Sequence, residues 1–227
     1  MSLLEVKNLT FEYGTGKFRN LALDDVSFSL EKGEILSIIG HTGSGKSTLV
    51  QTLNGLLKPK SGTVCLDGEN IFSSTDLLKK ARFRVGLVFQ YPEYQLFEES
   101  VFKDISFGPK NMGLDNEEIG RRVFEASSFV GLRSELLGKS PFELSGGEKR
   151  RTAIAGILAM EPEILILDEP TAGLDPGSGR NLIENLIKLR DKNGTTIIIV
   201  SHSMENTAKI SDKIMVMNVG KCEMFGT

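Results

Sequence analysis

The sequence predicts an α/β fold with a mixed, mainly parallel sheet, an N-terminal antiparallel β-subdomain and an inserted α-helical subdomain. Three observations lead to this prediction. Short apolar runs rich in Ile and Val alternate with helical patterns, which is typical of parallel strands that are covered on both faces. The N-terminal part is instead rich in alternating, β-forming segments. A stretch in the middle of the chain has helical patterns without a convincing core strand.

The predicted strands fall into two groups. Those expected in the antiparallel sheet alternate polar and apolar residues or are rich in β-formers, and they are residues 4–13, 23–30 and 63–66. Those expected in the parallel sheet are almost entirely apolar, and they are residues 34–39, 85–89, 164–167 and 195–200. This change of pattern is the reason for expecting two sheets.

Helices are predicted where apolar residues recur with helical spacing, at residues 46–57, 117–130, 148–160 and 176–192. We expect residues 1–227 to form a single domain. Its core should comprise about residues 1–96 and 156–227, and the helical subdomain, at about 97–155, should be inserted between two sheet strands.

Composition narrows the possible classes of function. The net charge is −3 and both signs are mixed along the chain, so no basic field favours a nucleic-acid partner. The two cysteines, Cys65 and Cys222, have neither metal nor disulfide spacing, which favours a reducing, cytosolic setting. No apolar run approaches the ~20 residues that a spanning helix needs, and no signal peptide is recognised. The chain is expected to be soluble by itself, which leaves a membrane partner open.

A phosphate-binding loop is predicted after the strand at 34–39. Its residues fit the pattern G-x-x-x-x-G-K-[ST] and are Gly40, His41, Thr42, Gly43, Ser44, Gly45, Lys46, Ser47 and Thr48. A helix start offers roughly +0.5 charge and unpaired amide donors, which suit the phosphates of ATP. Lys46 would reach the β- and γ-phosphates, Ser47 would ligate Mg²⁺, and Thr48 would support the α-phosphate. His41 occupies a variable position, and we interpret it as a tolerated loop residue without a catalytic role.

Two carboxylates follow the apolar run at 164–167. Because side chains alternate along a strand, Asp168 and Glu169 should point in different directions. Asp168 would then hold Mg²⁺, usually through water, and Glu169 would face the γ-phosphate and polarise the attacking water. The alternative is an ordinary polar strand end, which the phosphate loop and the following Pro170 disfavour.

Two further polar residues follow predicted strands. Gln90 comes after the strand at 85–89, and its amide would contact Mg²⁺ and the attacking water. His202 comes after the strand at 195–200, and its imidazole would bond the γ-phosphate and orient the water held by Glu169. Taken singly, each is better explained by a capped strand end or a core histidine, and only the other motifs favour a catalytic role.

A second anion-binding helix start is predicted at residues 144–148. Ser145, Gly146 and Gly147 precede a helix, and helix starts bind anions through their free amides. One monomer cannot use both this start and the phosphate loop on the same nucleotide. We therefore expect a head-to-tail pair of subunits, in which Ser145 of one covers the γ-phosphate held by the other.

These motifs, in this order, resemble those of the ATP-binding cassette (ABC) ATPases over essentially the whole chain. The resemblance implies an ATP hydrolase that requires Mg²⁺ and works as a nucleotide-sandwich dimer, with Asp175 in the loop that contacts the partner. Tyr13 matches the aromatic residue that stacks on adenine, and the alternative for it is a half-buried strand tyrosine. Glu148 departs from the signature, which often carries Gln, although family members tolerate this change.

The segment after Gln90 looks like a narrower group, the ATPase subunits of energy-coupling-factor transporters, which import vitamins or transition-metal ions such as cobalt. The similarity covers residues 89–97 and 104–111, and the chain looks like the second of the two ATPase types in that group. It implies a second ABC ATPase subunit in a homo- or heterodimer, a transmembrane coupling protein that enters a groove lined by residues 91–101, and a substrate-binding membrane subunit. The chain would lie at the cytoplasmic face of the cell membrane, and no nucleic acid is expected.

Two other functions are weighed against this one. The first is a soluble ABC ATPase acting on nucleic acid or the ribosome, but the coiled coil of DNA-repair members and the second cassette of translation-type members are absent. The second is a module that binds ATP without hydrolysing it. Such a module would be expected to lack Glu169 or His202, and both are present. Because such transporter subunits usually carry a further C-terminal segment, the end at Thr227 suggests a truncated chain or a shorter variant.

Overall fold

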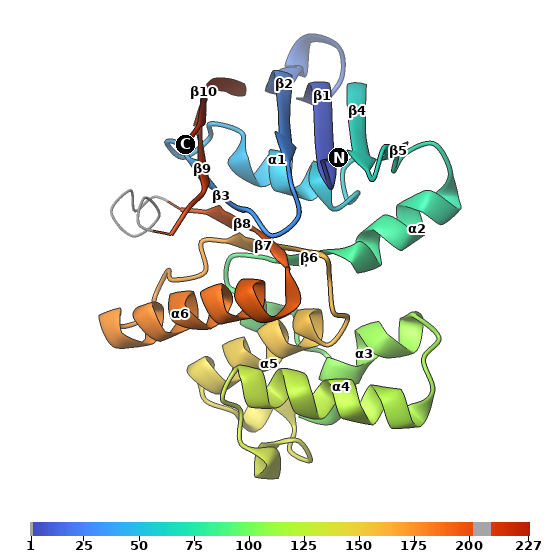
Figure 1. The fold of residues 1–227 in the computed structure, drawn as a ribbon, viewed down its shortest axis with the longest axis vertical. Helices are drawn as coiled ribbons and strands as arrows, with labels where there is room; N and C mark the ends of the chain where they lie inside the picture. Colours follow the sequence, from blue (N-terminus) through green and yellow to red (C-terminus); the bar gives the residue numbers. More distant parts are fainter. Residues whose placement is uncertain (1, 202–209) are drawn as a thin grey trace. The chain divides into compact units, whose positions relative to one another are not determined.

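The computed structural model describes residues 2–201 and 210–227 (Figure 1). The chain divides into two compact units. The first unit joins Met1–Leu87 to Glu163–Thr227, and the second is Val88–Pro162. Both ends of the second unit therefore connect to the first.

An antiparallel sheet of four strands forms the N-terminal part of the first unit, as predicted (Figure 1). Its strands are β1 (Leu4–Tyr13), β2 (Asn20–Leu30), β4 (Ser61–Leu66) and β5 (Glu69–Asn70), in the order β2-β1-β4-β5. The central strand β1 pairs with both β2 and β4. One short helical turn, η1 (Gly16–Phe18), joins β1 to β2.

The second sheet is mainly parallel, which confirms the predicted fold class. It contains β3 (Ile35–Ile39), β6 (Val85–Val88), β7 (Ile164–Asp168), β8 (Thr196–Val200), β9 (Lys213–Asn218) and β10 (Lys221–Gly226), in the order β10-β9-β3-β8-β7-β6. Every residue of β3, β7 and β8 is buried. Burial on both faces explains why these strands are almost entirely apolar in the sequence.

Among the described residues of the first unit, three segments form α-helices: α1 (Lys46–Leu53), α2 (Thr75–Arg84) and α6 (Pro176–Asn193). The predicted end of the first helix, at residue 57, was wrong. Asn54 caps the helix, and Gly55 takes a left-handed conformation with φ of 76°. Because a left-handed residue ends helical hydrogen bonding, the chain turns before the Lys58-Pro59 pair that had suggested the later end. Helix α2 was not predicted.

The second unit is helical. Its α-helices are α3 (Val101–Asn111), α4 (Asn116–Phe129) and α5 (Gly146–Leu158), and its short turns are η2 (Pro92–Gln95), η3 (Ser134–Leu136) and η4 (Pro141–Glu143). The two helices expected here, at 117–130 and 148–160, are confirmed as α4 and α5. Helix α3 was missed because Gly108 and Pro109 interrupt its pattern, and Pro109 in fact lies in its last turn.

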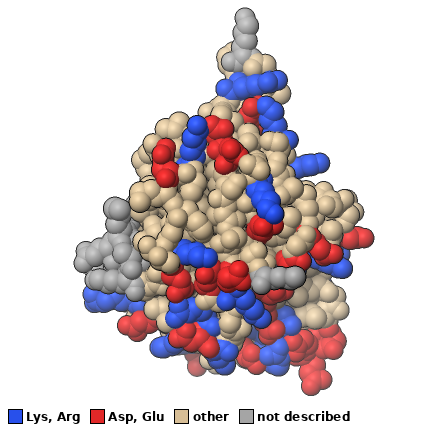
Figure 2. Space-filling model, turned by 45° about the horizontal axis from the view of Figure 1, so that its top comes forward, with Lys and Arg blue, Asp and Glu red and all other residues tan. Residues whose placement is uncertain are grey.

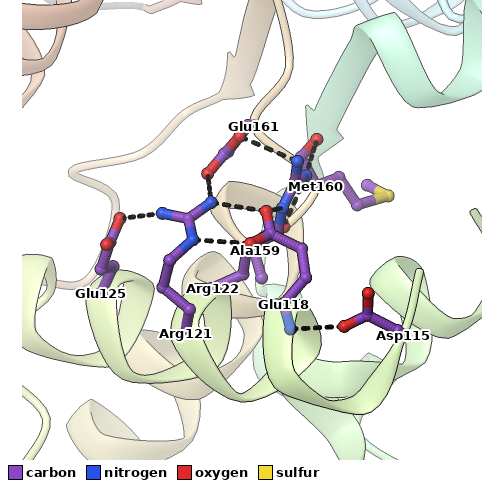
Figure 3. Close-up of polar contacts among 8 residues, drawn as sticks. All are labelled: Asp115, Glu118, Arg121, Arg122, Glu125, Ala159, Met160 and Glu161. Carbon is purple, nitrogen blue, oxygen red and sulfur yellow. Dashed lines mark hydrogen bonds and ion pairs between the residues drawn. The ribbon is translucent and has the colours of Figure 1, made fainter.

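Arginines of α4 bind the C-terminal end of α5 (Figure 3). Arg122 donates to the carbonyl oxygens of Ala159 and Met160, at 3.5 and 3.3 Å. Its guanidinium also pairs with Glu118 at 2.7 Å and with Glu161 at 3.0 Å. The last carbonyls of a helix lack partners inside it, so Arg122 both caps α5 and fixes it against α4.

The Arg122→Ala variant is expected to lose stability, because these carbonyls and carboxylates lose a charged donor. Only 13% of the Arg122 side chain is exposed, so we expect a loss of about 1–3 kcal/mol in the free energy of unfolding. The matched control is Arg121→Ala, whose side chain pairs with Glu118, Glu125 and Glu161 but is 44% exposed. Exposed pairs contribute about 0–1 kcal/mol. Urea unfolding of the two variants measures the difference, and equal losses would contradict the capping role.

Charge is distributed in both signs over the face that Figure 2 shows, where basic and acidic side chains lie interspersed. Charged side chains of the first unit also form ion pairs, as in Arg84 with Glu163 at 2.6 Å. Among the residues that the structure describes, no helix combines the length and the apolar character needed to cross a bilayer.

Candidate functional site

The predicted phosphate loop lies between β3 and α1 in the first unit. Two of its glycines could carry no side chain. A Cβ on Gly40, at φ of 153°, would lie 2.2 Å from the carbonyl oxygen of Met217, and a Cβ on Gly45, at φ of 101°, would lie 2.5 Å from that of Ala22. The loop backbone is thus pressed against β2 and β9, which fixes its curvature. Thr42 and Gly43 are exposed at its tip, and Ser44 is fully buried beneath it.

Lys46 begins α1 and is only 6% exposed. Its Nζ donates to the carbonyl oxygens of Gly40 and His41, at 2.8 and 2.9 Å. Burial lowers the pKa of Lys46, while the charges of Glu169 and Asp168 oppose that shift. The ammonium group is therefore held inside the curve of the loop, close to two carboxylates.

The side chains of Ser47 and Asp168, the two predicted magnesium ligands of the first unit, are joined by a hydrogen bond. The Ser47 hydroxyl donates to Oδ2 of Asp168 at 2.9 Å, across a separation of 121 residues. Magnesium prefers oxygen ligands and usually keeps several waters, completing its shell with phosphate oxygens. The pair fits such an ion, and the described residues contain no cluster of three acidic, histidine or cysteine side chains that could hold a metal by themselves.

Asp168 and Glu169 differ in their backbones. Asp168 is the last residue of β7 and is 8% exposed. Glu169 leaves the strand in a left-handed conformation, with φ of 51°, and its amide donates to the Val200 carbonyl at 2.9 Å. Non-glycine residues in this region are uncommon and gather at functional sites. Glu169 therefore lies outside the strand on whose alternation the expected divergence of the two carboxylates was based, and that divergence stays a prediction.

Tyr13, at the end of β1, lies beside the helix that starts in the phosphate loop. Its hydroxyl is 3.3 Å from Oγ1 of Thr48, and its ring packs edge-on against Phe11 with centroids 4.8 Å apart. The side chain is 43% exposed. Tyr13 is thus partly exposed next to Thr48, the residue predicted to support the α-phosphate.

His41 has a contact that sequence reasoning missed. Its Nδ1 lies 2.7 Å from the Thr42 carbonyl oxygen, and its Nε2 lies 3.1 Å from Oδ1 of Asn218. The Gly220 amide also donates to the Ser44 carbonyl at 3.0 Å. The turn between β9 and β10 therefore supports the phosphate loop. No local signal could have shown this, because Asn218 is 177 residues away in the chain.

The second unit holds four further residues of the predicted site, Gln90, Ser145, Gly146 and Gly147. Gln90 is exposed and follows β6. Ser145 caps α5, and Gly146 and Gly147 form the first turn of that helix, as predicted. All three are exposed. Their proximity to a nucleotide stays a prediction.

Two further residues of the predicted site are Asp175 and His202. Asp175 caps α6, since its Oδ1 accepts from the amides of Gly177 and Ser178 at 2.9 and 3.0 Å. Hydrogen bonds from Ser178 and Gly177 hold the pKa of Asp175 below its ordinary value. His202 lies outside the described residues, so its predicted role is not tested by the geometry.

The chain is similar in sequence to transport proteins. The family description "ABC transporter" matches residues 23–172. A protein of Caldanaerobacter subterraneus subsp. tengcongensis is 57% identical over 99% of this chain and 79% of its own length. One from Clostridioides difficile is 57% identical over 100% of this chain and 79% of its own length. Both are named energy-coupling factor transporter ATP-binding protein EcfA2.

Solved structures with the same fold are also related in sequence. CbiO1 from Clostridium perfringens, described as part of the ABC transporter complex cbiONQ, has a TM-score of 0.87 and 41% identity, covering 99% of this chain and 88% of that one. The ATP-binding cassette MJ0796, described as dimeric in a post-hydrolysis state with ADP and Pi, has a TM-score of 0.89 and 30% identity over 99% and 98% of the two chains.

Proposed function

The chain belongs to the ABC transporter family, and we propose that it is the ATPase subunit that powers import of a vitamin, or of a transition-metal ion such as cobalt, through a transmembrane complex. It is an ABC-type ATP hydrolase. The names of the relatives support the transport role, since they are ATP-binding proteins of energy-coupling-factor transporters. A separate, membrane-embedded subunit would select the cargo.

One observation supports the proposal that ATP is hydrolysed at the phosphate loop. It is the Ser47–Asp168 hydrogen bond, which joins the loop to the end of β7. It brings the carboxylate turn to the phosphate loop. Lys46 would donate to the β- and γ-phosphates from the interior of the loop, and Tyr13 would stack on adenine. Glu169 would accept a proton from the attacking water, with Gln90 and His202 orienting that water.

Magnesium would be held by Ser47 and Gln90, and by Asp168 through water. When bound, it neutralises phosphate charge and orients the γ-phosphate. The contribution of the chain is to fix these oxygen ligands. Because the Ser47 hydroxyl donates its proton to Asp168, its lone pairs would be the groups that ligate the ion.

The working unit would be a pair of ABC ATPase subunits, either two copies of this chain or this chain with a related one. The dimer described for MJ0796 supports such a pair. In it, Ser145, Gly146 and Gly147 of one subunit would cover the nucleotide held by residues 40–48 of the other. The division into a nucleotide-binding core at 1–96 and 156–227 and a signature subdomain at 97–155 stays a prediction.

The docking surface for the transmembrane coupling protein would lie on the second unit. Exposed aromatic side chains lie along and next to the predicted groove, and we call them the aromatic surface. Its members are Tyr91, Tyr94, Phe97 and Phe107, which are 46%, 85%, 58% and 45% exposed. The rings of Phe97 and Phe107 pack edge-on at 5.0 Å. Oδ2 of Asp104 accepts from the amides of Phe97 and Glu98 at 3.3 and 3.1 Å, which fixes the loop that carries Phe97.

The Tyr94→Ala variant tests this surface and the transport role together. When the tagged chain is purified from native membranes, we expect membrane subunits to copurify with it. Exposed aromatic anchors often contribute 2 kcal/mol or more at interfaces, so recovery of these subunits should fall roughly tenfold or more in the variant. Phe124→Ala is the control, because Phe124 on α4 is 54% exposed but lies outside the aromatic surface.

Other outcomes of this purification point elsewhere. Equal recovery of membrane subunits with both variants would contradict the docking surface. Recovery of nucleic acid or ribosomes instead would favour the alternative of a soluble ABC ATPase. Copurified membrane subunits would also support a peripheral position at the cytoplasmic face of the membrane, and their identity would indicate the cargo.

A further inference from the structure

The hydroxyl of Ser145 is hydrogen-bonded to a residue of the helix that Ser145 caps. Ser145 and Glu148 form a reciprocal capping box at the start of α5. Oγ of Ser145 accepts from the Glu148 amide at 3.4 Å. Oε2 of Glu148 accepts from the Ser145 amide at 3.0 Å and from the Ser145 hydroxyl at 2.7 Å. The carboxylate thus takes both protons that Ser145 can donate.

A phosphate oxygen would need those same protons. A serine hydroxyl has one proton to donate, and a phosphate oxygen bearing negative charge can only accept. While Glu148 holds the Ser145 proton, the hydroxyl presents only lone pairs to an approaching phosphate. Covering a γ-phosphate with Ser145 therefore requires that Glu148 first release the hydroxyl.

The charge of Glu148 adds to this competition. Hydrogen bonds from the Ser145 hydroxyl and amide hold the pKa of Glu148 below its ordinary value, and Arg133 acts in the same direction. The carboxylate is therefore ionised at neutral pH, one helical turn from the predicted phosphate contact. Arg133 lies 3.4 Å from it, but 70% of the Arg133 side chain is exposed, so solvent and salt weaken that compensation.

We propose that Glu148 opposes ATP-driven pairing by competing with the partner's γ-phosphate for Ser145 and by repelling it, and that Arg133 moderates this repulsion. This inference rests on the proposed function and makes position 148 a positioning residue for the signature. A neutral glutamine would still complete the capping box but would carry no charge. The residue at this position would therefore set the ATP concentration at which the two subunits close.

The test compares Glu148→Gln with its parent in a Glu169→Gln background, so that hydrolysis does not reopen the pair. The ATPase pair is purified with whichever second subunit copurifies, and ATP-dependent closure is followed by light scattering or sedimentation. Removing one charge close to a multiply charged phosphate should lower the half-maximal ATP concentration about tenfold. Arg133→Gln should raise it severalfold, and ~1 M salt should shrink both effects.

The control is Glu143→Gln, which removes an exposed carboxylate from η4 without touching Ser145 and should change closure little. Thermal unfolding followed by circular dichroism checks that Glu148→Gln keeps α5 intact. If the parent closes with ATP and Glu148→Gln closes no more readily than Glu143→Gln, the inference is overturned. If the parent pair shows no ATP-dependent closure at all, the proposed function fails instead.

Discussion

Glu169→Gln is expected to bind ATP normally, to remain paired with its partner subunit, and to hydrolyse ATP roughly 10²- to 10³-fold more slowly, as is typical for the loss of one transition-state contact. The amide has the same shape as the carboxylate but cannot take a proton from water. Glu169 follows β7 in a left-handed turn whose amide bonds Val200. Its backbone is therefore fixed independently of the side chain, and the variant should fold normally.

Steady-state phosphate release and equilibrium ATP binding separate the two roles of this site. Glu184→Gln is the matched control, because Glu184 is an exposed residue of α6, and it should hydrolyse ATP at the parent rate. A normal rate in Glu169→Gln would mean that another group accepts the proton. Lost ATP affinity in that variant would mean that Glu169 acts in binding.

Lys46→Ala is expected to abolish measurable ATP binding. Lys46 is 6% exposed, and its removal would leave the phosphate charges without their buried cation. Truncating one partner of a buried charge pair costs about 2–5 kcal/mol, which corresponds to a loss of affinity of roughly 30- to several thousand-fold. Titration with a fluorescent ATP analogue measures this directly.

The control for Lys46→Ala is Lys58→Ala, which removes an exposed lysine beyond the end of α1 and should leave affinity unchanged. Because Lys46 also donates to Gly40 and His41, thermal unfolding must show that the variant is folded. Normal ATP affinity in a folded Lys46→Ala variant would rule out the phosphate-loop assignment.

The strands and helices could be predicted mostly where one local pattern dominates. The buried strands β3, β7 and β8 are continuous apolar runs, and β1 was predicted with its observed bounds. The errors occurred where the local pattern misleads. Pro109 hides α3 although it only occupies the last turn, and the left-handed Gly55 ends α1 earlier than its apolar pattern suggests.

The sequence by itself determined the chemical groups of the candidate site, because each motif is a run of neighbouring residues whose spacing along a loop, strand end or helix start defines its chemistry. Tertiary structure alone decided which of these groups meet. Ser47 reaches Asp168 across 121 residues and His41 reaches Asn218 across 177, and such contacts depend on how the sheet orders its strands. Hydrogen bonding in three dimensions also decided that Glu148 holds the Ser145 hydroxyl, since spacing alone does not say which acceptor receives a proton.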